Sequence, residues 1–278
     1  MATPGVAPAP AAARGVADRI WRRFTFAQRL TRFLIYLAIV AAIVVSVQTV
    51  EVIPEFLADA PEQVADLLTR MWPIDFDHYP GPVHAALMET IHIATLGTLL
   101  SLILALPVGV LAAHNLVPVT SLNLAAKLIL VSSRSVNSLV WALLFVGIFG
   151  PGALAGTLAI AFRSIGFVGK LFGEALEETQ AGPIEALTAA GAPWASRMSF
   201  GYWPQVKPAF WSIALFRWDI NVRESAVLGL VGAGGIGMTL DSALNLFQWP
   251  RVALILLAIL AVVILAEVVV TQVRRRMI

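Results

Sequence analysis

Charged side chains inside apolar stretches are the residues of this sequence best suited to chemistry. Arg217, Asp219, Arg223 and Glu224 all fall within the stretch 209–231. A charge at the centre of a membrane helix costs about 2.5–3.5 kcal/mol on insertion scales, so such residues usually face a cavity or a partner. Asp219 and Arg223 are four residues apart, which is the spacing for a pair on one helix face. Arg217, and the helix face that carries Arg223, then remain as candidate contacts for an anion.

Arg134 lies in a second apolar stretch, among hydroxyl and amide side chains (Ser132, Ser133, Ser135, Asn137 and Ser138). This cluster suits a polar path through a membrane, and guanidinium groups bind oxyanions through charge-assisted hydrogen bonds. The candidate pathway residues are therefore Arg134, Ser135, Asn137, Arg217 and Arg223. An alternative stays open, in which Asp219–Arg223 is only structural and Arg134 extends to the cytoplasmic headgroups.

Other kinds of site are poorly supported by the sequence. There is no cysteine, which excludes disulfides and thiolate chemistry, and the histidines at 78, 84, 92 and 114 form no pair at ligand spacing. We therefore expect no metal site. A catalytic nucleophile with its base is also not found, so we do not expect an enzyme.

A glycine-rich segment carries a misleading motif. Gly232, Gly234 and Gly237 satisfy G-x-G-x-x-G, but the dinucleotide fingerprint needs a βαβ unit and an acid about 20 residues further on. Asp241 comes too early for that role. We expect these glycines, with Gly235, to allow close helix packing or to form a gate. No G-x-x-x-x-G-K-[ST] occurs, so we expect this chain to bind no cofactor and not to hydrolyse ATP itself.

The elements that must position these residues are membrane helices. The chain is 59% hydrophobic and only 13% charged, whereas globular domains are nearer half apolar and a quarter charged. A span needs about 20 mostly apolar residues. We expect an all-α membrane protein with about six spans, at 33–50, 91–113, 136–149 (extended back through 128–131), 150–162 and beyond, 209–231, and 252–270.

Lys and Arg near the span ends predict the orientation. Arginines precede the first span and Arg274–Arg276 follow the last, so both termini should be cytoplasmic. The segment 51–83 holds seven Asp/Glu and one Arg, and we expect it to be an external loop. Residues 1–32 should be a cytoplasmic tail, and 33–278 a membrane domain with a cytoplasmic loop at 171–208.

That cytoplasmic loop contains the sequence GPIEALTAAGAPWASRMSFGYWP from Gly182. Pro183 fits the first helical position, Glu185 suits the first turn, and Gly191 suits the left-handed residue that ends a helix. The pattern predicts a compact helical hairpin on the cytoplasmic face that can seat in a partner's groove.

The hairpin resembles the EAA loop of ABC importer permeases: Glu-Ala-Ala, three residues, Gly, then nine residues before Ile-x-Leu-Pro. Glu185, Ala186, Gly191 and Pro204 fall at matching positions, and Leu187 stands for the second Ala. In that family the loop docks into the ATP-hydrolysing subunit. The resemblance therefore implies coupling roles for Pro183, Glu185, Ala186, Leu187, Ala190 and Gly191.

A second resemblance narrows the family. The segment 227–237 is similar to one shared by phosphonate and methionine permeases, and residues 139–178 with Asn221-Val222-Arg223 look like the phosphonate-type permeases. The resemblance covers roughly residues 85–273. It implies a type I importer permease that works as a homodimer in the bacterial cytoplasmic membrane. Two ATP-binding subunits and an extracytoplasmic binding protein would be its partners, with no nucleic acid.

The implied substrate is a phosphonate or a related oxyanion such as phosphite or phosphate. A permease for methionine or another amino acid is the nearest alternative. Alternatives from other classes are an intramembrane enzyme acting on lipid or phosphate esters, and a structural scaffold that would not need the Glu-Ala/Gly loop. We expect Arg134 and Arg223 to matter more for transport than for folding.

Overall fold

The computed structural model describes residues 24–50 and 53–277, so the Ala/Pro-rich start of the expected tail lies outside the described residues. Within them every regular element is helical. The chain divides into two compact units, residues 1–63 and 64–278, and each is treated by itself.

In the first unit, helix α1 (Phe26–Thr49) has no buried residue. Its start is fixed by a capping box, in which Gln28 N donates to Thr25 Oγ1 at 3.4 Å and Thr25 N donates to Gln28 Oε1 at 3.1 Å. The helix therefore begins seven residues before the expected span.

Helix α2 (Pro54–Arg70) forms in the segment expected to be a loop. Its sequence carries ordinary helix signals, with Pro54 at the first position, Glu55 in the first turn and Arg70 in the last. Two short helical turns, Phe76–His78 and Tyr79–Val83, then lead into α3. The segment is acidic, as its sequence shows, but it contains a helix that the sequence analysis did not predict.

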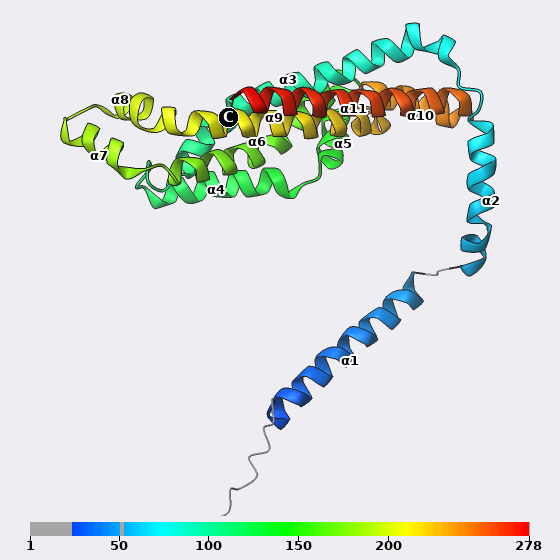
Figure 1. The fold of residues 1–278 in the computed structure, drawn as a ribbon, viewed down its shortest axis with the longest axis horizontal. Helices are drawn as coiled ribbons and strands as arrows, with labels where there is room; N and C mark the ends of the chain where they lie inside the picture. Colours follow the sequence, from blue (N-terminus) through cyan, green and yellow to red (C-terminus); the bar gives the residue numbers. More distant parts are fainter. Residues whose placement is uncertain (1–23, 51–52, 278) are drawn as a thin grey trace, which may run out of the picture. The chain divides into compact units, whose positions relative to one another are not determined.

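The second unit is a bundle of long helices (Figure 1). Their bounds are α3 His84–Ala112, α4 Thr120–Ser135, α5 Ser138–Phe149, α6 Ala153–Glu177, α9 Trp203–Leu228, α10 Ile236–Asn245 and α11 Trp249–Met277. Helix α6 packs against α3, α4, α5 and α9, which places it at the centre. The short helices α7 (Ala181–Ala189) and α8 (Trp194–Ser196) lie at one end of the unit, and α10 lies toward the other (Figure 1).

Backbones touch where α3 crosses α6. A Cβ added at Gly109 would lie 2.9 Å from the Gly169 carbonyl oxygen, and one at Gly173 would lie 3.1 Å from the Gly109 carbonyl oxygen. One at Gly97 would lie 2.7 Å from the Ile160 side chain. Small residues permit this approach, which is the usual way in which helices pack in lipid.

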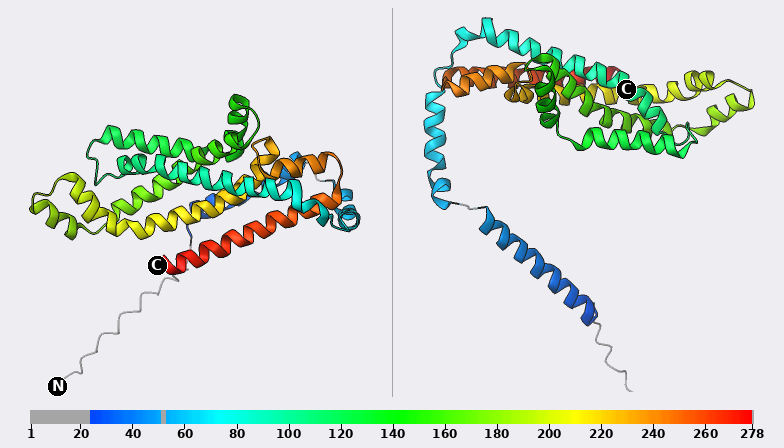
Figure 2. Two further views of the ribbon diagram at one scale, coloured as in Figure 1. Left: turned by 90° about the horizontal axis from the view of Figure 1, so that it is seen from above. Right: turned by 180° about the vertical axis from the view of Figure 1, so that it is seen from behind.

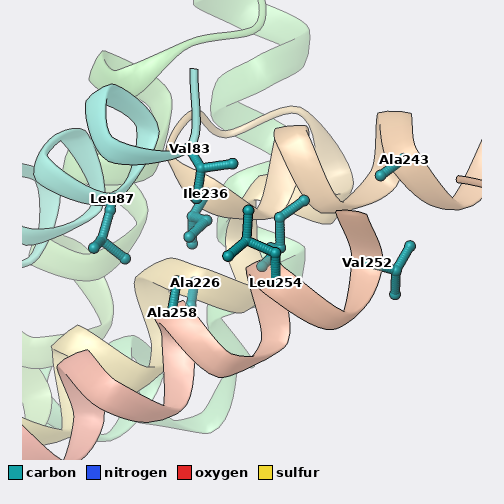
Figure 3. Packing of buried hydrophobic residues seen from close by; sticks show 9 residues of the cluster. Val83, Leu87, Ala226, Ile236, Ala243, Val252, Leu254 and Ala258 are labelled. Carbon is teal, nitrogen blue, oxygen red and sulfur yellow. The ribbon is translucent and has the colours of Figure 1, made fainter. Parts of the chain in front are cut away.

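An apolar cluster joins the glycine-rich end of the bundle to the last helix (Figure 3). Ile236 and Ile255 are fully buried there, and Val83 from the turn before α3 is equally enclosed. The cluster also contains Leu87, Ala226, Ala243, Val252, Leu254 and Ala258. It holds α9, α10 and α11 together at the end opposite the hairpin.

Four described helical stretches are long and apolar enough to cross a membrane: Phe26–Thr49, Phe76–Ala112, Ala153–Glu177 and Trp249–Arg276. Two bent pairs, Thr120–Ser135 with Ser138–Phe149 and Trp194–Val231 with Ile236–Asn245, raise the number to six if each pair is one span. This agrees with the expected count of about six.

The expected third span is not straight. Helices α4 and α5 meet at 90°, and Figure 2 shows α5 turned away from α4. The break falls at Val136 and Asn137, where Asn137 begins α5 by accepting a hydrogen bond from Leu139 N at 3.1 Å. An Asn side chain that caps a helix start favours a new helix over a continuous one.

Candidate transport path and coupling surface

Three arginines from three helices line one hollow in the second unit. Arg134 comes from the last turn of α4, Arg163 from α6 and Arg217 from α9, and Ser135 and Phe167 complete the lining. Helix α6 packs against both α4 and α9, so the side chains converge. Three of the five predicted pathway residues therefore lie at one place.

Arg217, a candidate contact for an anion, is already paired within the bundle. Its side chain is only 4% exposed, and Nη2 lies 3.3 Å from Oε2 of Glu224. Arg163 Nη1 bonds the other oxygen, Oε1, of the same carboxylate. Residues 217 and 224 are two helical turns apart, so they share one face of α9. Two arginines thus share one carboxylate, which lowers the cost of burying them.

A chain of hydrogen bonds continues from Arg217 into the bundle. Arg217 Nε donates to Ser164 Oγ at 2.8 Å, and Ser164 Oγ donates to Asn221 Oδ1 at 3.2 Å. Asn221 Nδ2 donates to Thr98 Oγ1 at 2.7 Å. These residues are buried and come from α3, α6 and α9. A satisfied polar chain of this kind fixes how the three helices face one another. The Phe167 ring, 5.6 Å from the Arg217 guanidinium carbon, adds a cation–π contact.

The hollow also contains positive charge that the ion pairs and hydrogen bonds of Arg217 do not neutralise. Arg134 is exposed and makes no hydrogen bond or ion pair within the described part of the chain. Arg163 has a buried Nε with no hydrogen-bond partner there. The arrangement can therefore accept an anion without breaking the Arg217 contacts.

Arg223 and Asn137 do not lie in the hollow. The predicted Asp219–Arg223 pair is confirmed, with Arg223 Nη2 2.7 Å from Asp219 Oδ2. The same nitrogen is 3.8 Å from Glu267 Oε2 on α11. This second ion group lies on the opposite face of α9 from Arg217, as the 3.6-residue period requires. Asn137 is occupied in capping α5.

The predicted hairpin has the expected ending. Gly191 has φ of +71°, which confirms the predicted left-handed residue. Its N–H donates to Thr188 O and that of Ala192 donates to Leu187 O, both at 3.0 Å, which is the Schellman pattern. The start differs, because α7 begins at Ala181 and Pro183 takes its third position. A proline is tolerated there, since first-turn N–H groups have no partner within the helix.

Helix α7 turns a small-sided face outward. Pro183, Glu185, Ala186 and Ala190 are exposed, whereas Ile184 and Leu187 pack inward against the Gly201 backbone. Leu187, which stands where the family motif has alanine, therefore packs the two arms of the hairpin together.

Gln205 ties this hairpin to α9, and the sequence analysis missed it. Its Oε1 accepts from Gln180 N at 2.9 Å, at the start of α7, and its Nε2 donates to Gly201 O at 2.8 Å. Nothing in the sequence distinguishes this glutamine from a solvated one. Arg163 was missed too, although it interrupts an apolar stretch as Arg134 does.

The glycine segment is packed against the first turns of α3 and α6 and against the end of α9. A Cβ at Gly237 would lie 2.3 Å from Ala226 O, one at Gly235 2.6 Å from Thr90 Oγ1, and one at Gly234 2.7 Å from Ala153 N. Gly232 differs in having space for a Cβ, and it shares a positive φ, of +83°, with Gly234 and Gly235. Its carbonyl accepts from Gly152 N at 2.9 Å.

The bundle and its hairpin define a membrane permease with the type I ABC importer fold. Two solved structures share this fold: an amino acid ABC transporter (TM-score 0.61, 18% identity, 72% of this chain and 95% of that one) and the MetNI methionine ABC transporter in an inward-facing conformation (TM-score 0.62, 21% identity, 70% and 96%).

The chain belongs to the family of binding-protein-dependent transport system inner membrane components, whose model matches residues 105–278. It is thus a multi-pass inner-membrane transport subunit and not an enzyme.

Curated relatives are similar over much of the chain. The phosphate-import permease protein PhnE of Mycolicibacterium smegmatis is 37% identical over 84% of this chain and 44% of its own length. The phosphite transport system permease protein PtxC of Stutzerimonas stutzeri is 39% identical over 73% of this chain and 74% of its own. The chain therefore spans less than half the length of the first relative and about three quarters of the second.

Proposed function

We propose that this chain is the permease subunit of an ATP-driven importer of phosphorus oxyanions such as phosphonate, phosphite or phosphate. The observation that carries the proposal is the hollow of Arg134, Arg163 and Arg217, which offers guanidinium groups to an anion at the middle of the bundle. The names of the similar permeases, for phosphate and phosphite, agree with that chemistry.

The working assembly would hold two copies of the chain, two ATP-binding subunits and an extracytoplasmic binding protein. The exposed face of α7, with Pro183, Glu185, Ala186 and Ala190, would dock into the ATPase, which binds ATP and Mg²⁺. Both chain termini would be cytoplasmic. The glycine segment 232–237, at the far end of the bundle from α7, would form the external gate.

An amino acid permease is the second candidate, because both similar solved structures transport amino acids or methionine. That likeness concerns the fold. A hollow with an excess of arginine suits a zwitterion poorly, since burying unbalanced positive charge is costly.

Reconstitution tests the proposal. The permease, its ATPase and its binding protein are placed in liposomes, and ATP-driven uptake of labelled phosphate, phosphite, methylphosphonate and methionine is compared. Uptake of one or more phosphorus oxyanions without methionine is expected. Uptake of methionine alone would reject the proposed substrate class.

A further inference from the structure

Resting on the proposed function, we infer that Arg163 and Arg134 form an anion site selective for dianions, with Glu224 as its built-in counter-ion. The inference starts from the number of charges around the hollow. Three guanidinium groups line it, and one carboxylate, Glu224, bonds two of them. The hollow therefore carries two positive charges that no described residue lining it neutralises.

The position of the hollow makes this charge matter. Arg163 is the eleventh residue of the 25-residue α6, and Arg217 is the fifteenth of the 26-residue α9. At 1.5 Å per residue, each lies roughly 16–22 Å from the start of its helix, near the middle of a bilayer about 30 Å thick. Charges there interact more strongly than in water, so a ligand that balances them is favoured over one that does not.

A phosphate-type group supplies the matching charge. Such a group carries about −1.5 to −2 at pH 7 and offers three acceptor oxygens. A phosphinate, with a similar tetrahedral phosphorus, carries only one negative charge. A zwitterionic amino acid carries no net charge. The dianion therefore leaves the hollow neutral, and the other two leave it positive.

The donors needed for this ligand are free. Arg163 Nε is buried without a hydrogen-bond partner, and Arg134 makes no contact that would hold it elsewhere in the described chain. A guanidinium offers five N–H donors in a planar fork, which matches a tetrahedral oxyanion. Ser135 Oγ donates its one hydrogen to Val131 O at 2.7 Å, so the two arginines supply the donors.

Glu224 has a positioning role in this scheme. Without it, Arg163 and Arg217 would repel one another in the empty site. Its two oxygens each hold one arginine, so the fork of Arg163 is oriented before the ligand arrives. Arg217 is fixed further by Ser164 and serves the network more than the ligand.

Ligand binding can be measured without turnover by ³¹P NMR line broadening on the purified permease–ATPase complex. The probes are methylphosphonate, a dianion at pH 8.5, and dimethylphosphinate, a monoanion at any such pH. The wild-type complex should broaden the methylphosphonate line at a concentration about tenfold lower than it needs for dimethylphosphinate. Arg163→Gln should weaken methylphosphonate binding about tenfold or more, because one charge-assisted contact is lost.

Two further variants complete the design. Arg134→Gln removes a side chain that has no partner among the described residues, so this variant should fold as wild type and still bind methylphosphonate more weakly. It provides the deciding measurement if Arg163→Gln does not assemble. Lys207→Gln removes an equal charge from an exposed position on α9 outside the hollow and should bind as wild type.

Equal broadening of both probes by wild type would overturn the dianion site, and so would unchanged binding in both arginine variants. If the complete transporter imports a phosphorus oxyanion but the complex binds neither probe, the site is wrong and the proposed function stands. If the complete transporter imports no phosphorus oxyanion, the proposed function itself is rejected.

Discussion

Replacement of Gly191 tests the proposed coupling role of the hairpin directly. A Cβ at this position would meet no atom within 4 Å, so any effect must come from the backbone and not from a clash. With φ at +71°, Gly191 is in the left-handed region, where a β-branched residue is strained by about 1–3 kcal/mol. At about 1.4 kcal/mol per factor of ten, the closed hairpin should lose roughly 5- to 150-fold in population in Gly191→Val.

A graded series sharpens this prediction. Asn tolerates the left-handed region, so Gly191→Asn should stay near wild type. Gly191→Ala should lose about 1 kcal/mol and fall between Asn and Val. The assays are co-purification of the ATPase and hydrolysis stimulated by the loaded binding protein. All variants should insert in the membrane. Wild-type values for Gly191→Val in both assays, or a ranking with Ala below Val, would refute the docking role of the hairpin.

Three other outcomes are expected. A cysteine replacing Asp66 should react with an impermeant maleimide from the external side, since the chain has no native cysteine; labelling only from the cytoplasm would reverse the topology. Gly237→Ala should lower the melting temperature, at a cost of about 1–3 kcal/mol, because its Cβ would meet backbone atoms, whereas Gly147→Ala, which meets nothing within 4 Å, should not lower it. Gln205→Leu should raise the ATP hydrolysed per substrate imported, because it removes the hydrogen bond that joins the start of α7 to α9 and the bond from Gln205 to Gly201 O, each worth about 0.5–1.5 kcal/mol.

The sequence predicted what depends on composition and on local backbone rules. Long uncharged stretches gave the spans, and the Gly191 position predicted a helix end. The Asp219–Arg223 pair followed from helical spacing. Each of these needs only residues near one another in the chain.

The remaining features needed three-dimensional contacts. Glu224 is bonded by Arg163, 61 residues away, and no spacing rule predicts that pair. The 90° break at Asn137 depended on an amide that looked like part of a polar path. The sequence placed Arg223 with Arg217 as a candidate anion contact, whereas in the structure Arg223 lies outside the hollow, near Glu267.

The glycine contacts between α3 and α6 limit how this protein can change shape. Packed helices usually slide because side chains switch rotamers, but at Gly109, Gly169 and Gly173 backbone meets backbone and has no rotamer to switch. We therefore expect the two helices to move as one body during a transport cycle. Bending is left to the places where helices are interrupted, namely the break at Val136–Asn137 and the turn between α9 and α10. Helices α3 and α6 would thus form a rigid unit, and the two interruptions would act as its hinges.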